Sequence, residues 1–211
     1  MTMEDTKPTR QHAWGEISQR MLSHAQSEAL SGAPDAVVLV EGLSDRAAVQ
    51  AVARKAGREL KEEGIAIVPM GGATNIRRFL TTFGPRGRDV RIAVLCDAAE
   101  SAYFARALMT ADADGELAGT LFVCHRDLED ELIRALGGAA VEAVIDQAGE
   151  LPSLRTLQQM PAHRDRPHDQ QLHRFMGTRS TRKYRYAQLL AEALPPEDVP
   201  RPLRDLVDSL V

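Results

Sequence analysis

Aromatic side chains make up only 4% of the 211 residues, and the chain has only two cysteines. A core with so few aromatic residues must rest on Leu, Val, Ile and Ala. Cys96 and Cys124 each end an apolar run, and neither a CxxC pair nor a zinc-type histidine spacing accompanies them. We therefore expect two reduced, buried thiols, not a disulfide or a structural zinc site.

Long apolar segments are also lacking. No run approaches the roughly 20 residues that a membrane-spanning helix needs, and the polar N-terminus has no apolar stretch of the secretory type. These absences predict a cytoplasmic protein with no membrane partner. We expect the first dozen residues to be disordered.

The net charge of -4 argues against a generic basic coat for nucleic acid. The charge is uneven, however, because residues 154–186 carry +6 and the remainder carries -10. Two interpretations stay open, a basic nucleic-acid-binding face beside an acidic body and an ordinary solvated helical surface. The arginines of the expected nucleic-acid face are Arg164, Arg166, Arg174, Arg179, Arg182 and Arg185.

Four continuous apolar runs, at residues 36–40, 65–68, 90–96 and 120–124, predict strands buried on both faces. Helical patterns separate them, and this alternation predicts an α/β fold with a parallel sheet and helices on both faces. Residues 160–177 begin as a polar loop, of a kind that is often functional. The helices expected are residues 15–29, 46–62, 74–83, 100–110, 127–136, 139–147, 152–159, 184–193 and 203–210.

Acidic residues follow three of the four expected strands. Glu41 comes directly after the first, Asp97 after the third, and Glu129 shortly after the fourth. Ligands of open α/β sheets bind at the carboxyl ends of strands, where a buried carboxylate needs a partner or a metal. Asp45, taken alone, would be an ordinary charge in the first turn of a helix. Together these acids predict a site for one or two Mg²⁺ or Mn²⁺ ions.

Several segments together resemble a known domain. VVLVEGLSDRAAV, VPMGGATN, VLCDAAE and DLEDEL resemble the Toprim domain, which topoisomerases, primases and the OLD (overcoming lysogenization defect) nucleases share. STRKYRYA, residues 180–187, is similar to the OLD-family segment that carries an active-site lysine ahead of a helix. The resemblance covers about residues 34–193. It implies a Rossmann-like four-stranded Toprim core at 34–137, after a tail and helix at 1–33 and before a helical extension at 138–211.

The resemblance also implies a role for each matching acid. Glu41 and Asp45 match the metal ligands of the EGxxD element, and Asp97 matches the first acid of a DxD element. Glu129 matches an acid that OLD-type domains add after the fourth strand. Glu41 would thus serve both metal binding and catalysis.

Two further positions bear on catalysis. Ala99 stands where the family has the second acid of DxD, and we expect Glu100, one residue later, to substitute as a ligand. Lys183 matches the lysine proposed to stabilise charge on the phosphate. On its own, Lys183 would be only a charge that positions a phosphate.

The leading hypothesis is a metal-dependent nuclease that acts on DNA, with RNA left open as a substrate. A non-catalytic module that binds nucleic acid or a partner, its second metal site lost at Ala99, is the alternative. The chain has no G-x-x-x-x-G-K-[ST] loop, so we expect the OLD ATPase half to be missing. A subunit that works with a separately encoded ATPase is therefore a third hypothesis. A homodimer is also left open.

Overall fold

In the computed structural model of the chain, residues 10–112, 117 and 120–210 are described. Of the N-terminal residues expected to be disordered, 1–9 lie outside this part, and the others belong to the first helix, which begins earlier than predicted. The elements in chain order are α1 (Arg10–Ser31), β1 (Ala36–Val40), α2 (Leu43–Lys55), β2 (Ile65–Pro69), η1 (Ala73–Asn75), α3 (Ile76–Phe83), β3 (Arg91–Asp97), α4 (Ser101–Ala111), β4 (Leu121–Cys124), α5 (Leu128–Leu136), α6 (Gly138–Gln147), α7 (Leu151–Gln159), α8 (His168–Met176), α9 (Ser180–Ala193), η3 (Pro196–Asp198) and α10 (Arg201–Asp208).

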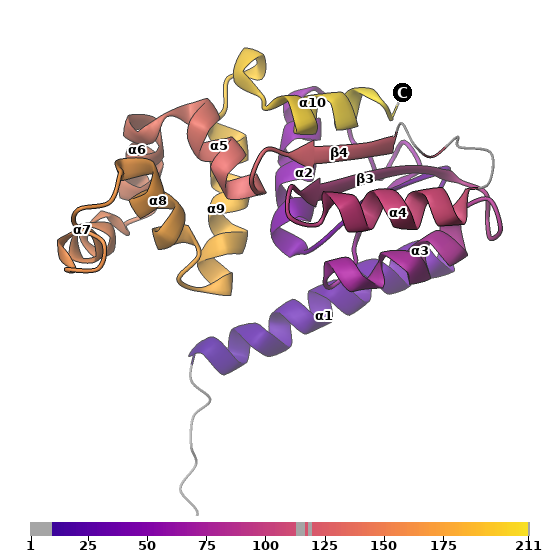
Figure 1. Cartoon of the computed structure of the whole chain (residues 1–211), viewed down its shortest axis with the longest axis horizontal. Helices are drawn as coiled ribbons and strands as arrows, with labels where there is room; N and C mark the ends of the chain where they lie inside the picture. The colour runs from indigo at the N-terminus through magenta and orange to yellow at the C-terminus, as the bar shows by residue number, and fades with distance from the viewer. Residues whose placement is uncertain (1–9, 113–116, 118–119, 211) are drawn as a thin grey trace, which may run out of the picture.

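The four predicted strands form one parallel sheet in the order β2-β1-β3-β4 (Figure 1). The central strand β1 is buried along its whole length, and its Val38 lies between Ile67 of β2 and Ala93 of β3. A strand covered on both faces explains a continuous apolar run without polar alternation. Because all strands run in the same direction, the residues that follow them meet at one edge of the sheet.

Helices cover both faces of the sheet, as the alternation of patterns predicts. Val37 and Leu39 of β1 belong to a core shared with α1, α3 and α4. Val38 and Val40 point to the other face and belong to a core shared with α2 and the C-terminal helices. Successive residues of the strand thus supply the two cores alternately.

The C-terminal helices α5 to α9 form a lobe beside the sheet (Figure 1). Their apolar residues continue one of the two cores, since Tyr186 and Leu190 of α9 belong to the same cluster as Ala48 and Val49 of α2. This packing fixes α9 relative to the strand ends. The division at residues 137 and 138 stays a prediction.

The prediction that the second helix runs to residue 62 is wrong, because α2 ends at Lys55. Gly57 has φ +74°, a left-handed conformation that glycine adopts without a Cβ penalty. The next residue, Arg58, then donates its backbone N–H to the Ala53 carbonyl over 3.0 Å, which closes the end of the helix. The helical pattern of residues 58–62 is overridden by this glycine.

Residues 160–167 form the polar loop predicted for the start of segment 160–177, but the helix α8 in its second half was not predicted. Its residues Leu172, Phe175 and Met176 are fully buried and follow helical spacing. The next helix, α9, begins at Ser180 and not at residue 184. Lys183 therefore lies inside the first turn of a helix and not ahead of it.

Two expectations about composition can also be checked. Cys96 and Cys124 are free and buried, as predicted. No helix in the described ranges combines the length and the apolar character needed to cross a membrane.

Candidate metal centre at the carboxyl end of the sheet

The ends of β1 and β3 place Glu41 and Asp97 side by side. The two strands are paired neighbours, and the Glu41 carboxylate accepts a hydrogen bond from the backbone N–H of Asp97. Glu100, the residue before α4, completes the group, since one carboxylate oxygen of each residue lies within 4.8 Å of the others. Three oxygens so close together can coordinate one hard cation.

An unsatisfied atom indicates that this group fits a metal. Glu41 Oε1 is buried and has no hydrogen-bond partner among the described residues. A buried acceptor without a partner is unfavourable unless a cation or a donor completes it. Glu100 also places a carboxylate in this group one residue after Ala99. The sequence reading of Glu100 as a substitute ligand is therefore geometrically consistent, although its coordination stays a prediction.

Asp45 lies in the first turn of α2, as the sequence predicts. Its Oδ2 accepts the backbone N–H of Gly42 over 2.8 Å, so the side chain caps the helix. Burial raises the pKa of Asp45, and Lys183 partly opposes that rise. The structure confirms Asp45 as a charge in the first turn of a helix. Asp45 is not one of the three residues grouped around Glu41, and its role as a metal ligand stays a prediction.

The double-glycine turn after β2 forms hydrogen bonds with the backbone of Glu41. The backbone N–H groups of Gly71 and Gly72 donate to the Glu41 carbonyl over 2.9 and 3.1 Å. Asn75 closes the turn by donating its side-chain N–H to the Met70 carbonyl over 3.0 Å. The GGxTN element therefore acts on the site indirectly, by fixing the backbone of one acid.

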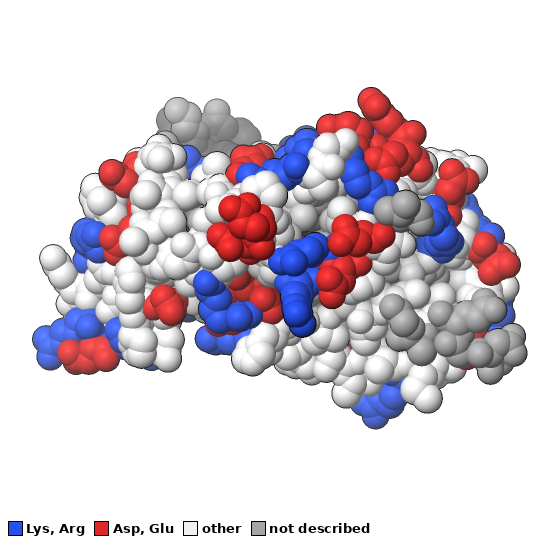
Figure 2. Space-filling view, turned by 90° about the horizontal axis from the view of Figure 1, so that it is seen from above, with Lys and Arg blue, Asp and Glu red and all other residues white. Residues whose placement is uncertain are grey.

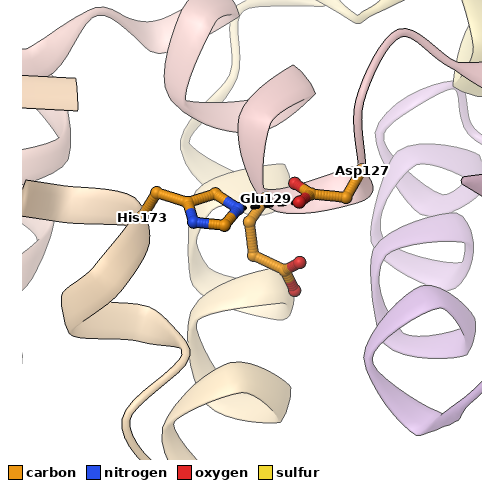
Figure 3. A group of neighbouring side chains, drawn as sticks. All are labelled: Asp127, Glu129 and His173. Atoms are coloured by element: carbon orange, nitrogen blue, oxygen red, sulfur yellow. Dashed lines mark hydrogen bonds and ion pairs between the residues drawn. The ribbon is translucent and has the colours of Figure 1, made fainter. Parts of the chain in front are cut away.

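A second group forms at the start of α5, where Asp127, Glu129 and His173 converge (Figure 3). Their ligand atoms lie within 4.8 Å of one another. Asp127 caps α5 with Oδ1, 2.9 Å from the Asp130 amide, and its Oδ2 lies 2.8 Å from His173 Nε2. Glu129 is 5% exposed, and its Oε1 has no partner among the described residues. This second group could therefore also receive a cation.

Lys183 connects the second group to the first. Its Nζ lies 3.2 Å from Glu129 Oε2. Burial alone would lower the pKa of Lys183, but the charges of Glu129, Asp45 and Asp97 outweigh burial and raise the pKa. The lysine is therefore a permanent positive charge among the acids. Its place within α9, packed on α2, holds it there.

Negative charge is crowded around the strand ends. Burial, followed by the charges of Asp45 and Glu41, raises the pKa of Asp97 to about 7. Burial also raises the pKa of Glu41, and Glu100 and Asp45 add to that rise. One residue before Asp97, burial and the charge of Glu41 raise the pKa of the Cys96 thiol to about 12. A divalent cation is the kind of ligand that would stabilise such a site.

Arg182 differs from the other arginines expected to bind nucleic acid. It forms two 3.1 Å hydrogen bonds with the carboxylate of Glu150, and its guanidinium lies 4.0 Å from the centre of the Phe175 ring. Its side chain is only 10% exposed. These contacts give Arg182 a structural role and leave little of it for a phosphate.

The remaining five arginines are exposed, and their side-chain contacts differ. Arg174 and Arg179 have no side-chain partner in the described part of the chain, whereas Arg164 lies beside Asp165 and Arg185 donates to the Ala148 carbonyl. Figure 2 shows one face of the molecule, on which described basic side chains lie among acidic ones instead of forming a band. Part of the positive charge of residues 154–186 is thus neutralised by neighbouring carboxylates, as at Arg164 and Arg182.

His173 and Asp127 are site residues that the sequence reading missed. Asp127 stands where the sequence predicts a helix to begin, and it is the N-cap residue of α5. His173 lies on α8, a helix that the sequence pattern did not lead us to predict. The spacing of Leu172, Phe175 and Met176 is the signal that could have revealed α8 and the face on which the histidine lies.

Comparisons with known proteins agree with this geometry. Residues 34–98 match the family model described as the Toprim domain of overcoming lysogenization defect protein-like proteins. A search of curated proteins gives no significant match.

Solved structures extend the likeness to most of the chain. The C-terminal region of the Xanthomonas campestris pv. campestris OLD protein is 26% identical, with a TM-score of 0.66 over 84% of this chain and 92% of that one. The C-terminal region of the Burkholderia pseudomallei OLD protein is 21% identical, with a TM-score of 0.63 over 84% and 97%. Residues 34–98 therefore resemble an OLD-like Toprim domain, and most of the chain shares the fold of the C-terminal region of OLD proteins.

Proposed function

We propose that this chain is a metal-dependent nuclease that hydrolyses phosphodiester bonds of DNA in the cytoplasm. The observation that supports the proposal most directly is the convergence of Glu41, Asp97 and Glu100 around a buried carboxylate oxygen without a partner. The likeness to OLD proteins favours the same activity by analogy of fold and motif.

Five carboxylates are suited to hold one or two Mg²⁺ or Mn²⁺ ions, namely those of Glu41, Asp45, Asp97, Glu100 and Glu129. A bound ion supplies Lewis-acid stabilisation of the charge that develops on phosphoryl oxygens. The protein's own contribution includes holding Glu41 and Asp45 in place, through the Gly71–Gly72 turn and the first turn of α2.

Lys183 is suited to stabilise negative charge on the scissile phosphate. Its ammonium group is positively charged and lies at the acidic site, 3.2 Å from Glu129. A fixed positive charge aimed at developing negative charge is among the largest single contributions to catalysis. Within α9 the lysine keeps this position without needing a substrate to order it.

The exposed arginines Arg164, Arg166, Arg174, Arg179 and Arg185 are proposed to contact the backbone of the nucleic acid. Such contacts give binding that does not depend on sequence and that weakens as salt concentration rises. DNA is the substrate proposed, and parallel assays on RNA of the same length decide between the two.

The first prediction concerns nicking of supercoiled plasmid in Mg²⁺ and in Mn²⁺. The wild type is expected to nick it, and Glu41→Ala and Lys183→Ala are each expected to reduce the rate at least about 100-fold, because each removes a group that stabilises the transition state. Agarose-gel assays under single-turnover conditions measure the rates. Glu59→Ala and Lys61→Ala, which change exposed residues, serve as matched controls and should retain activity.

A wild type that binds DNA but does not nick it in either metal would contradict the nuclease. The non-catalytic binding module would then be the better description. Nicking that appears only when a separately encoded ATPase is added would identify the chain as the nuclease subunit of a two-component enzyme.

A further inference from the structure

A cavity lies beside the metal centre, and Lys183 borders both. Its volume is about 290 Å³, and its walls come from α1, the start of α2, the glycine turn and the start of α9. Figure 1 shows how these segments meet, since α1 runs beneath the sheet with its N-terminal end below the start of α9. None of the acids of the metal centre lines this cavity.

An aromatic pair forms part of its wall. Trp14 of α1 and Tyr184 of α9 have ring centroids 5.5 Å apart at an interplanar angle of 45°. Both rings are only partly buried, and both line the cavity. Leu22 and Leu43 add apolar surface. A planar heterocycle can stack on partly exposed aromatic rings that lie next to apolar side chains such as these.

The electrostatics of this cavity differ from those of the metal centre. No acidic residue is among the described residues that line it, and Lys183 lies in its wall. The helix α9 also begins there, and no side chain caps its first turn. Uncapped N–H groups at a helix N-terminus favour an anion. The cavity therefore presents an apolar, aromatic part next to a part that attracts phosphate.

The size of the cavity restricts what can occupy it. A volume of about 290 Å³ lies just below the range of about 300–1,000 Å³ seen for small-molecule sites. A single base can enter such a space, but a base pair within a duplex cannot, because its faces are stacked on its neighbours.

We propose that this cavity binds an unpaired nucleobase of a single-stranded nucleic acid, stacked on the Trp14–Tyr184 pair, while Lys183 holds the adjacent phosphate. This inference rests on the proposed nuclease function and specifies its substrate as one with an unpaired nucleotide at the cleavage site. Trp14 acts here as a binding residue on the N-terminal helix, outside the segment that matches the family model.

The experiment measures binding without cleavage, in EDTA, with the full chain. The probes are an oligothymidine of about twelve nucleotides, within the range of about 4–16 nucleotides of single-strand sites, and an abasic chain of equal length. Because Trp14 is the only tryptophan, its fluorescence reports on the cavity directly. Oligothymidine is expected to quench this fluorescence, and the abasic chain and a duplex of the same length are not.

Variants separate stacking from backbone binding. By fluorescence anisotropy of labelled oligothymidine, Trp14→Ala and Tyr184→Leu are each expected to weaken binding about 5- to 100-fold, since each removes a stacking surface. Trp14→Phe keeps a ring against Tyr184 and should retain most of the affinity, which excludes misfolding as the cause. Tyr103→Leu, on α4, is the matched control and should bind as the wild type does.

The outcomes distinguish this inference from the nuclease itself. Equal affinity of the wild type for oligothymidine and the abasic chain, or no effect of Trp14→Ala, would overturn the base-binding cavity even if plasmid nicking succeeds. A preference for oligothymidine that Tyr184→Leu abolishes would support the cavity even if no cleavage is found.

Discussion

Single residues at the metal centre carry unsatisfied hydrogen-bonding capacity. Glu129 is 5% exposed, and while one of its oxygens binds Lys183, the other has no partner among the described residues. Glu41 Oε1 is in the same condition. Each buried unpaired acceptor costs about 1–3 kcal/mol. A protein can retain such a cost in its unliganded state when a ligand satisfies the group on binding. The site therefore favours binding at the expense of the stability of the metal-free fold.

The same reasoning predicts that Asp97→Asn stabilises the metal-free protein. The pKa of Asp97 is raised to about 7, so the folded state favours the protonated carboxyl, and the ionised form destabilises the fold at higher pH. Between about pH 4 and pH 7 the folded state binds more protons than the unfolded state, so wild-type stability falls as pH rises. At pH 8 in EDTA, Asp97→Asn should raise the free energy of unfolding by about 1–3 kcal/mol.

Urea denaturation measures this difference. Asp146→Asn removes an exposed carboxylate on α6 and should change the free energy of unfolding by less than about 0.5 kcal/mol. If Asp97→Asn is less stable than the wild type in EDTA, the charge crowding described for the site is not the dominant effect there.

Among the elements, the turn after β2 does most to position an acid. Gly72 has φ +122° and ψ +151°, a region that is essentially restricted to glycine. Gly71 has φ +77°, and a Cβ built on it would lie 3.2 Å from Leu22 Cδ2 of α1. The turn therefore needs both glycines to bring its two N–H groups to the Glu41 carbonyl.

Gly72→Ala is expected to lower the free energy of unfolding by about 1–3 kcal/mol, because alanine is strained in this conformation. It should also weaken Mn²⁺ binding, measured by isothermal titration calorimetry, since the Glu41 backbone loses its support. Gly15→Ala is the control, because a Cβ there meets nothing within 4 Å in the exposed part of α1. That change should be neutral or stabilising by up to about 1 kcal/mol. Unchanged stability and metal affinity in Gly72→Ala would show that the turn tolerates a side chain.

At the scale of the whole molecule, the helical lobe holds Lys183 and His173 against the sheet, and ion pairs connect its helices. Glu142 of α6 pairs with Arg155 of α7, and Glu142 Oε1 lies 2.8 Å from His168 Nε2 of α8. The hydrogen bond from Arg155 is the largest cause that lowers the pKa of Glu142 to about 2, and His168 adds to it. One carboxylate thus ties three helices of the lobe together.

This arrangement predicts a pH dependence of stability. Because the folded pKa of Glu142 is lowered from 4.5 to about 2, its contribution is complete above about pH 4.5 and is lost as pH falls toward about 2. Glu142→Gln should lower the free energy of unfolding by about 1–2 kcal/mol at pH 7, discounted for partial exposure, and by progressively less below pH 4.5.

Urea unfolding across the pH series measures the difference between Glu142→Gln and the wild type. Glu197→Gln, an exposed carboxylate in η3, should show no such convergence with pH. A constant difference between Glu142→Gln and the wild type from pH 7 to pH 3 would mean that packing, and not the charge of the carboxylate, explains the loss.

Much of the molecule follows from the sequence by itself. The four strands and the helices between them are readable because burial on both faces demands continuous apolar residues, and covering helices demand a periodic stripe. The acids at Glu41 and Asp97 are readable as a shared site because parallel strands end at one edge. These features depend on local pattern and on a rule of topology, and neither needs coordinates.

Other features were decided only by tertiary structure, because they depend on side chains brought together from distant parts of the chain. The pairing of Lys183 with Glu129, the contact of His173 with Asp127, and the burial of Arg182 all require α8 and α9 to pack as they do. The packing of α8 in that lobe decides the structure of residues 168–176, whereas residues 160–167 keep the predicted polar loop. In the same way, only the path of α1 across the molecule places Trp14 beside Tyr184 and the strand ends.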